Sequence, residues 1–398
     1  MSAERSPLLE RIRRLDPPWR LLLVSLRRGD ALTTFFQEFS LSPGEWKQWL
    51  NLNIQHAVLP LVYRRFRDEG LLRHVPNSIK QRMQKLYLAN ISGNMRKIND
   101  LQKFCREIRE RGLSILLFKG PASSQLAYRD PALRTYTDID VVIRPRELEP
   151  VLEVLEEKGF SLSVDPTTRI RRYLHQTGRD FSASRGTMYL DFHQRITKGP
   201  AFFSLPVEVW QNTRILDIQG YGFQTFSLED TVVFLAIHCA KDGWNSFKTL
   251  HDLARLIRIS PLDWDRVFRL AAVFKSRLIL KIALYFTTEL LGESLPGEVR
   301  RRLEGCPRAQ RKFWFFSRRL FARRFRLDLM TWYATIPRCL DTPVARLRFY
   351  AWFLTHPSPM LHQGFFKIPA PLFSIYPLLA PFYMVFQYRR ERSRGKGL

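Results

Sequence analysis

The hydrophobic positions of this chain change their period several times along its length. Through residues 1 to about 105 they recur at helical spacing, at Leu21–Leu26 and again from Ile79 to Ile108, which predicts helices. Ser78 follows the turn-prone Pro76-Asn77 and suits the N-cap of the second helix. From about 111 to 200, apolar runs of strand length alternate with helical patterns, and from 201 to about 295 the pattern is helical again. The sequence therefore predicts an α+β fold.

One of the predicted strands begins with two acidic residues. Asp138-Ile139-Asp140 leads into the apolar run Val141, Val142 and Ile143, and this stretch predicts a strand. Because side chains alternate between the two faces of a strand, we expect Asp138 and Asp140 to point the same way. Two carboxylates on one face repel each other unless a cation lies between them, and Mg²⁺ prefers one or two carboxylates together with phosphate oxygens. The pattern predicts metal-assisted phosphoryl or nucleotidyl transfer.

Two further segments carry candidate residues for the same site. The apolar residues 116–118 lead into Lys119-Gly120-Pro121, which predicts a strand, a turn and a helix beginning near Ala122. The free N–H groups and positive dipole end of such a helix attract anions. Downstream, the predicted strand Met188–His193 carries Asp191, which completes a three-carboxylate, two-metal site if its strand lies beside the first.

Each of these residues also has an ordinary structural explanation. Paired acids on a strand are commonly a solvated face, and Asp191 is also consistent with a structural acid at a strand edge. Lys119 and Arg134 suit a triphosphate, as a point charge and a bidentate fork, but they also suit salt bridges with nearby acids. His193 either orders the site and binds an acceptor, or is a buried, hydrogen-bonded histidine.

Several short motifs follow one another in a fixed order along the middle of the chain. They are Lys119-Gly120, Tyr128-x-Asp130-Pro131-x-x-Arg134, Asp138-Ile139-Asp140, Leu190-Asp191-x-His193, Ser227-Leu228-Glu229-Asp230, His238, Trp244 and Thr249-Leu250-His251-Asp252-Leu253-Ala254. This set resembles the uncharacterised nucleotidyltransferase family within the DNA polymerase β-type superfamily, and the resemblance covers residues 85 to 260. The superfamily usually has Gly-Gly or Gly-Ser in its phosphate-holding turn. This chain has Gly120-Pro121 there, which removes a backbone donor, with Ser123 and Ser124 further on.

The resemblance implies a polymerase β-type nucleotidyltransferase core, a small mixed sheet with helices, flanked by N-terminal and C-terminal helical regions. It implies an enzyme that moves a nucleoside monophosphate from an NTP such as ATP to an acceptor and releases pyrophosphate, with Mg²⁺ or Mn²⁺ as cofactor. The implied catalytic and metal-binding residues are Asp138, Asp140 and Asp191, of which the last activates the acceptor hydroxyl through a second metal. The implied nucleotide-binding residues are Lys119, Gly120, Ser123 and Arg134. The implied acceptor-side residues are His193, His238 and Asp252, although core packing and helix capping explain the last two equally well.

The pattern divides the chain into an N-terminal helical region (1–105), a nucleotidyltransferase core (106–200), a helical acceptor-side domain (201–300) and a basic aromatic C-terminal region (301–398). Between Arg301 and Arg326, ten Lys or Arg residues stand against one acid, with aromatic residues between them. Such a helix suits an anionic membrane interface or RNA, and an ordinary helix with its aromatics in the core is an equal alternative.

Residues 368–386 carry no charge and precede a basic flank, but four prolines argue against a regular transmembrane helix. We therefore expect an interfacial tail.

The charge balance indicates the kind of partner. The chain has 64 Lys and Arg residues against 37 Asp and Glu residues, a formal net charge of +27. This excess favours nucleic acid, a phosphate-rich glycan intermediate or an acidic membrane surface, although an arginine-rich bacterial composition also explains it. Four cysteines without metal-ligand spacing fit a reducing compartment.

The sequence predicts no signal peptide, so we expect a cytoplasmic protein that is peripheral at the inner face of the membrane. A glycan precursor, a peptide, a protein or RNA remain as acceptor classes. The alternative to an enzyme is a non-catalytic adaptor that keeps the fold and binds membrane or RNA through its basic C-terminal region.

Overall fold

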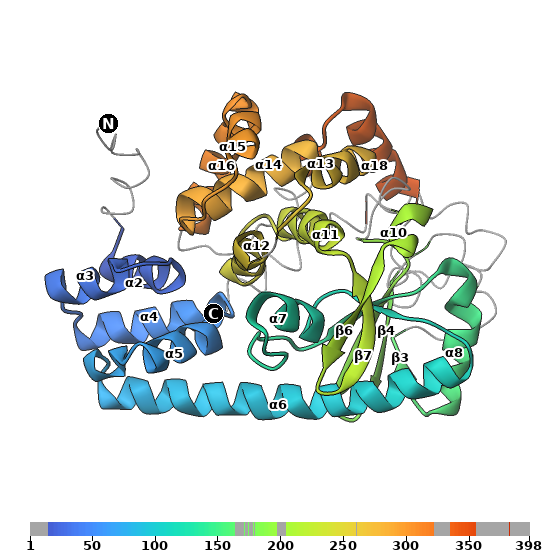
Figure 1. Cartoon of the computed structure of the whole chain (residues 1–398), viewed down its shortest axis with the longest axis horizontal. Coiled ribbons are helices and arrows are strands. Elements are labelled where there is room, and N and C mark those ends of the chain that lie inside the picture. The colour runs from blue at the N-terminus through green and yellow to red at the C-terminus, as the bar shows by residue number, and fades with distance from the viewer. Residues whose placement is uncertain are drawn as a thin grey trace.

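A seven-stranded mixed sheet forms the centre of the α+β fold in the computed structural model (Figure 1). The structure describes residues 15–163, 171, 174, 178, 180–196, 204–259, 261–321, 335–355 and 382. The strands are β1 (Leu116–Leu117), β2 (Ile139–Val142), β3 (Ser161–Leu162), β4 (Phe181–Arg185), β5 (Met188–His193), β6 (Thr213–Ile218) and β7 (Tyr221–Phe226). Their order across the sheet is β3-β4-β5-β2-β1-β7-β6. The pairs β2–β5 and β1–β7 are parallel, and the other neighbours are antiparallel.

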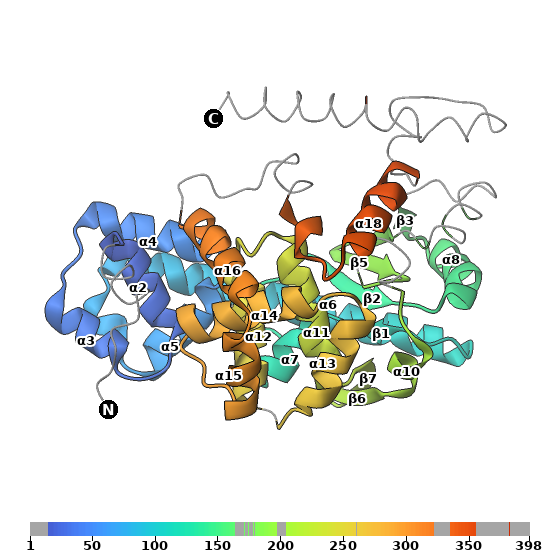
Figure 2. The same ribbon diagram turned by 90° about the horizontal axis from the view of Figure 1, so that it is seen from above.

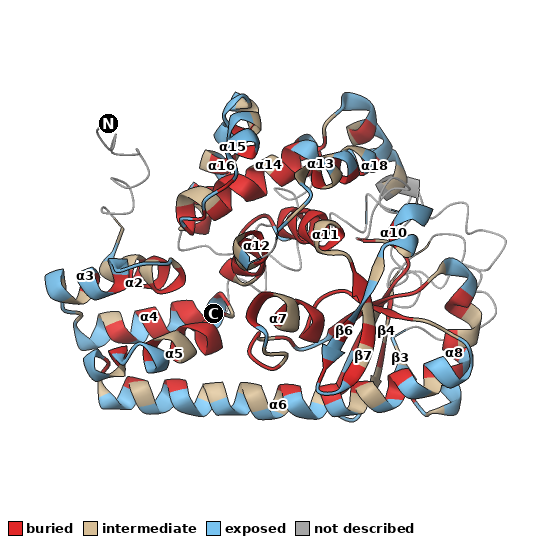
Figure 3. Ribbon diagram, viewed as in Figure 1, coloured by how far each residue is buried: buried red, intermediate tan, exposed pale blue. Residues whose placement is uncertain are grey.

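The two faces of the sheet pack against different helices. Ile139 and Val141 of β2 share a core with α6 (Asn77–Glu110) and α8 (Leu148–Glu157). Val142 points the other way, into the core that contains α11 (Leu228–Lys241) and α12 (Phe247–Ile259). Because side chains alternate along a strand, Asp140 lies on the same face as Val142, toward α11. Figure 3 shows the contrast between α11, which is buried on nearly all sides, and α6, which exposes its outer surface.

Most of the remaining helices extend the core on the α11 side of the sheet (Figure 2). Those before the sheet are α2 (Pro17–Leu26), α3 (Ala31–Glu38), α4 (Pro43–Gln55), α5 (Leu59–Asp68) and η1 (Leu71–His74). Those within and after it are α7 (Pro121–Tyr128), η2 (Pro145–Glu147), α10 (Val207–Gln211), α13 (Trp264–Val273), α14 (Arg277–Tyr285), η4 (Phe286–Leu290), α15 (Gly297–Glu304), α16 (Pro307–Leu320), η5 (Pro337–Cys339) and α18 (Pro343–Thr355). His56, directly after α4, contacts both Trp19 of α2 and Phe247 of α12. The N-terminal helices and the helices after the sheet therefore share one core.

The helix predictions for the first hundred residues are confirmed in the described residues, with one local difference. The long helix α6 begins at Asn77, so Pro76 occupies the N-cap position and Ser78 lies inside the first turn. Proline at this position has φ −54° and ψ 142°, which is the extended geometry of a residue that leads into a helix. The predicted N-cap was therefore two residues too late.

The prediction of helix from 201 to about 295 is wrong for residues 213–226. They form the antiparallel hairpin of β6 and β7, the last two strands of the sheet. Gln219 and Gly220 both have positive φ, at 57° and 75°, as a two-residue type I′ turn requires. Because the sheet continues to Phe226, it extends past residue 200, and the four-domain division stays a prediction.

The basic aromatic helix α16 packs much of its aromatic surface inside the protein. Phe313 and Phe316 are buried against Phe286 and Trp244, while Phe315 is 40% exposed. This arrangement is the ordinary core-packing alternative for that segment. The predicted tail at 368–394 lies, apart from Phe382, outside the described residues. Within the described ranges, no helix combines the length and apolarity needed to span a bilayer.

Candidate active site

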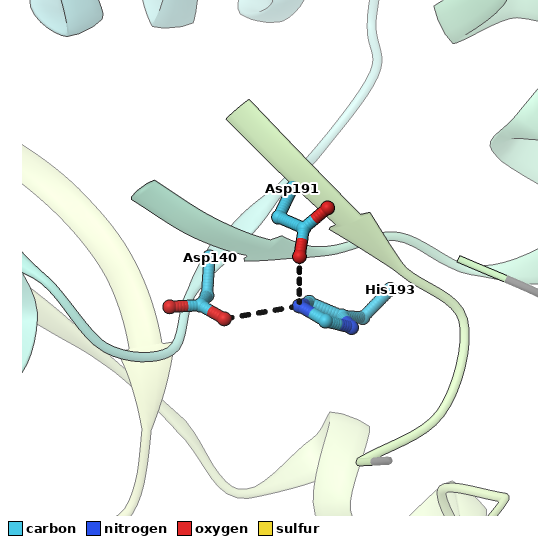
Figure 4. Close-up of side chains that lie close together, drawn as sticks. All are labelled: Asp140, Asp191 and His193. Atoms are coloured by element: carbon cyan, nitrogen blue, oxygen red, sulfur yellow. Dashed lines mark hydrogen bonds and ion pairs between the residues drawn. The ribbon is translucent and has the colours of Figure 1, made fainter. Parts of the chain in front are cut away.

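Two carboxylates face each other across the central strands. In the parallel pair of β2 and β5, Asp140 is directly opposite Asp191. His193 lies two residues beyond Asp191 and therefore on the same face of β5. One ligand atom from each of the three side chains lies within 4.8 Å of the other two, and Figure 4 shows the three side chains pointing toward one another. The predicted proximity of Asp140 and Asp191 is thus present in the structure.

His193 is held between acidic side chains. Its Nε2 lies 3.1 Å from Asp140 Oδ1 and 3.8 Å from Asp191 Oδ2, and its Nδ1 lies 3.2 Å from Asp180 Oδ1. Burial alone would lower the pKa of His193, but Asp180 and Asp140 outweigh it and raise the pKa to about 9. At neutral pH these two carboxylates therefore favour the protonated, positively charged form of His193.

Lys119 supplies the second positive charge to Asp140. It follows β1 directly, and its Nζ lies 2.7 Å from Asp140 Oδ1 in a pair whose two side chains are each 9% exposed. Lys119 Nζ also contacts His238 Nε2 from α11. Burial favours the neutral form of Asp140, but Lys119 and His193 hold its pKa well below the usual value for an aspartate. These positive neighbours therefore favour the ionised form of Asp140.

The three side chains fit a divalent metal. Carboxylate oxygens suit hard cations such as Mg²⁺ and Mn²⁺, and an imidazole nitrogen extends the range to softer divalent metals. A metal-binding histidine commonly donates its other ring N–H to a carboxylate, which is the position of Asp180 relative to His193. Asp191 is the more accessible carboxylate, at 25% side-chain exposure, and Ser182 Oγ donates to its Oδ1 at 2.5 Å. The arrangement can hold one divalent ion between β2 and β5.

Asp138 lies outside this group. Strand β2 begins at Ile139, so Asp138 precedes the paired residues and is exposed. Its Oδ1 accepts a hydrogen bond from Thr137 Oγ1 at 3.2 Å, and its charge acts on Lys97 and Lys248. The structure thus brings together Asp140 and Asp191 of the three predicted carboxylates, with His193 beside them.

Arg134 and Asp252 form a buried ion pair at the edge of the site. Arg134 Nε donates to Asp252 Oδ2 at 2.5 Å, and the other carboxylate oxygen accepts a hydrogen bond from Tyr128 Oη at 2.8 Å. Burial alone would lower the pKa of Arg134, but the negative charge of Asp252 outweighs burial. The net effect is a pKa above the usual value for an arginine. Arg134 also stabilises the charge of Asp140, so its guanidinium acts on the site although its bonds go to Asp252.

The turn after β1 has the geometry that its glycine allows. Gly120 has φ 60° and ψ −121°, a conformation that residues with a side chain rarely adopt. The next residue, Pro121, is the first residue of α7, as predicted for a helix beginning near Ala122. Ser123, in the first turn of α7, is fully buried, and its hydroxyl has no hydrogen-bond partner among the described residues. This hydroxyl is a free donor next to the glycine turn.

Three residues that the sequence interpretation missed belong to this neighbourhood. Lys241, in the last turn of α11, lowers the pKa of Lys119 and of His238, so its charge is close to both. Lys248 lies on α12, where first the charge of Arg134 and then burial lower its pKa to about 8. Asp180 directly precedes β4, whose first residue pairs with Phe192, next to His193. Its signal in the sequence was its place before an alternating strand, but only the strand pairing identifies His193 as its partner.

Comparison with known proteins gives one result. A sequence model of the family described as "Uncharacterised nucleotidyltransferase" matches residues 42–292, which is more than half of the chain. The search of curated proteins found no match to this chain.

Proposed function

The chain belongs to a family of uncharacterised nucleotidyltransferases, and we propose that it moves a nucleoside monophosphate from an NTP to an acceptor in a metal-dependent reaction. The acceptor oxygen forms a bond to the α-phosphorus, the bond from that phosphorus to the pyrophosphate oxygen breaks, and the acceptor proton passes to solvent. The observation that carries this proposal is the in-register placement of Asp140 and Asp191 with His193 beside them. On the same grounds we propose that the mixed sheet is a polymerase β-type core.

Asp140, Asp191 and His193 would hold the metal, and Asp180 would keep the imidazole oriented. When bound, the metal neutralises phosphate charge and lowers the pKa of an acceptor hydroxyl. A ring nitrogen binds a metal only when it carries no proton, so metal binding would compete with protonation at His193. Asp138 remains a predicted ligand that would have to approach from the exposed end of β2.

The cationic side chains around the metal group would bind the triphosphate. Lys119, Arg134, Lys241 and Lys248 act on one another electrostatically, which places several positive charges close together in one part of the protein. Like charges gathered in this way are stabilised by a polyanion. The unpartnered Ser123 hydroxyl and the N–H groups of α7 supply neutral donors, which offset the donor lost at Pro121. We therefore propose Lys119, Gly120, Ser123 and Arg134 as nucleotide-binding residues, with Lys241 and Lys248 added.

The direct test measures NTP binding and slow turnover with water as the default acceptor. Purified protein is mixed with Mg²⁺ or Mn²⁺ and each α-labelled NTP, and release of labelled monophosphate is followed along with binding of a non-hydrolysable analogue. We expect Asp191→Asn to reduce turnover by about 100-fold or more, because it removes a metal ligand. Asp140→Asn should have the same effect, with its melting temperature measured in parallel because Lys119 then loses a buried partner.

The matched control is Glu153→Gln, an exposed acid of α8 on the opposite side of the sheet. It should retain wild-type binding and turnover. Absence of metal-dependent NTP binding in the wild type, or equal turnover by Asp191→Asn and wild type, would refute the proposal. In that case the adaptor alternative predicts a cellular role that survives Asp140→Asn and is lost on removal of residues 301–398.

The acceptor and the cellular location stay predictions. His238 contacts Lys119, and Asp252 is bonded to Arg134 and Tyr128. The acceptor-side roles of His193, His238 and Asp252 stay predictions. Trp244 is in the core. The candidates among the acceptor classes remain a glycan precursor, a peptide, a protein and RNA, and peripheral contact with an anionic membrane remains a proposal for the C-terminal region.

A further inference from the structure

A polar cavity has in its wall Tyr128, whose hydroxyl is bonded to Asp252. It has a volume of about 500 Å³ and is bounded by the segment between α2 and α3, by α5, by the end of α7 and by α12. These elements lie beside one another in Figures 1 and 2. A cavity of this size accommodates a small molecule.

The side chains that line the cavity carry an excess of positive charge. They include six arginines (Arg27, Arg28, Arg64, Arg65, Arg255 and Arg258) and three acids (Asp30, Asp68 and Glu69). Three of the arginines are neutralised by carboxylates, namely Arg64 by Asp68 and Asp130, Arg65 by Glu69, and Arg258 by Glu293. The other three have no ion pair within the described parts of the chain.

Arg255 is the most informative of these three. Its side chain is partly buried, its Nε donates to Ala127 O at 3.3 Å, and its terminal nitrogens have no other bond to a described residue. Burial lowers its pKa, and the neighbouring charge of Arg258 and that of Arg28 lower it further. Arg27 is also partly buried, with its pKa lowered by burial and only partly restored by Glu289. Partial burial of unpaired like charges is unfavourable unless an anion is present.

One wall of the cavity is bonded directly to the candidate active site. Tyr128 and His251 line the cavity and are hydrogen-bonded to each other at 2.8 Å. Tyr128 Oη also donates to Asp252, whose second oxygen holds Arg134. A single carboxylate thus separates this cavity from the cationic group around the metal ligands.

We propose that this cavity is a binding site for a small molecule that carries a diphosphate or a comparably charged phosphate group. Guanidinium groups are suited to phosphate because they donate paired, charge-assisted hydrogen bonds. Several unpaired arginines match a multiply charged group better than a single carboxylate. Arg255 and Arg28 bind the phosphate oxygens, with Arg27 beside them, and Tyr128 and His251 form the floor. The site is separate from the proposed NTP site and does not depend on nucleotidyl transfer.

The test uses inorganic pyrophosphate as the probe, in isothermal titration calorimetry of the full chain without divalent metal. We expect binding by the wild type and at least a tenfold loss of affinity in the double variant Arg28→Gln/Arg255→Gln. Arg255→Lys should give an intermediate affinity because it keeps the charge and loses the fork. The control is Arg82→Gln/Arg96→Gln, two exposed arginines of α6, which changes the net charge equally.

The outcomes separate this site from the nucleotide site. Retained pyrophosphate binding in Lys241→Gln/Lys248→Gln, which removes two positive charges of the proposed nucleotide site, supports the cavity, whatever that variant does to turnover. Equal loss of affinity in the two double variants, or no binding by the wild type at physiological salt, overturns the proposal. If the occupant is the acceptor, phosphorylated acceptors that bind the cavity become nucleotidylated; if it is an effector, they change turnover and are recovered unmodified.

Discussion

At the scale of single residues, the candidate site depends on how one histidine is held. Asp180 Oδ1 lies 3.2 Å from His193 Nδ1, while Nε2 faces Asp140 and Asp191. A carboxylate in this position fixes the ring orientation and raises the basicity of the nitrogen that binds metal. We predict that Asp180→Asn weakens Mn²⁺ binding by about 10- to 100-fold. Titration of Mn²⁺ by electron paramagnetic resonance measures this, with Glu153→Gln as the unaffected control; unchanged affinity in Asp180→Asn would rule out the supporting role.

The same residues mark the limit of sequence interpretation. Alternation along an apolar run was enough to predict Asp140 and Asp191 as neighbours, provided that their strands pair. The exact start of β2 decides that Asp138 falls outside the group, and apolar patterning does not fix strand ends to one residue. Asp180, Lys241 and Lys248 come near the site through strand pairing and helix packing, and no local pattern in the sequence identifies their partners.

At the scale of elements, the turn between β1 and α7 depends on Gly120. A side chain added there would meet its nearest atom, Asp138 O, at 3.5 Å, which is an ordinary contact, so the penalty comes from the backbone alone. With φ at 60°, Gly120→Ala should destabilise the fold by about 1–2 kcal/mol. Gly93, inside α6, has helical geometry and open space around it, so Gly93→Ala should stabilise by about 0.5–1 kcal/mol. Urea unfolding of both variants tests the pair, and a shift of the same sign in both would contradict the argument.

The hairpin of β6 and β7 lies where the hydrophobic pattern predicted helix. The stretch from Thr213 to Phe226 has alternating hydrophobic residues around Gln219-Gly220, and that turn joins β6 to β7. Helices α10 and α11 lie directly before and after the hairpin in the chain. The helical spacing of hydrophobic residues around it therefore hides the two short strands. Its strand β7 pairs in parallel with β1 and completes the sheet beside the glycine turn. Long-range pairing of this kind is set by packing, which a local period does not encode.

At the scale of the whole molecule, His56 links the N-terminal helices to the helices after the sheet. It is fully buried between Trp19 and Phe247, and burial lowers its pKa to about 3. In the unfolded chain a histidine has a pKa of about 6.5. Between these two values the unfolded state binds the proton and the folded state does not, so stability decreases as the pH falls below about 6.5.

The difference in His56 pKa between the folded and unfolded states predicts how the stability of the protein responds to acid. Each pH unit between about 6.5 and 3 removes up to about 1.4 kcal/mol of stability through His56. His56→Phe keeps the aromatic contacts and removes the titrating group, so the decrease in unfolding free energy from pH 6.5 to 4.5 should become shallower by about 2 kcal/mol. His251, whose pKa is also lowered to about 3, continues to contribute in the variant. Urea unfolding at the two pH values gives the comparison directly. Equal pH dependence in the wild type and His56→Phe would mean that His56 accepts its proton in the folded protein, and that the shared core is open to water at this point.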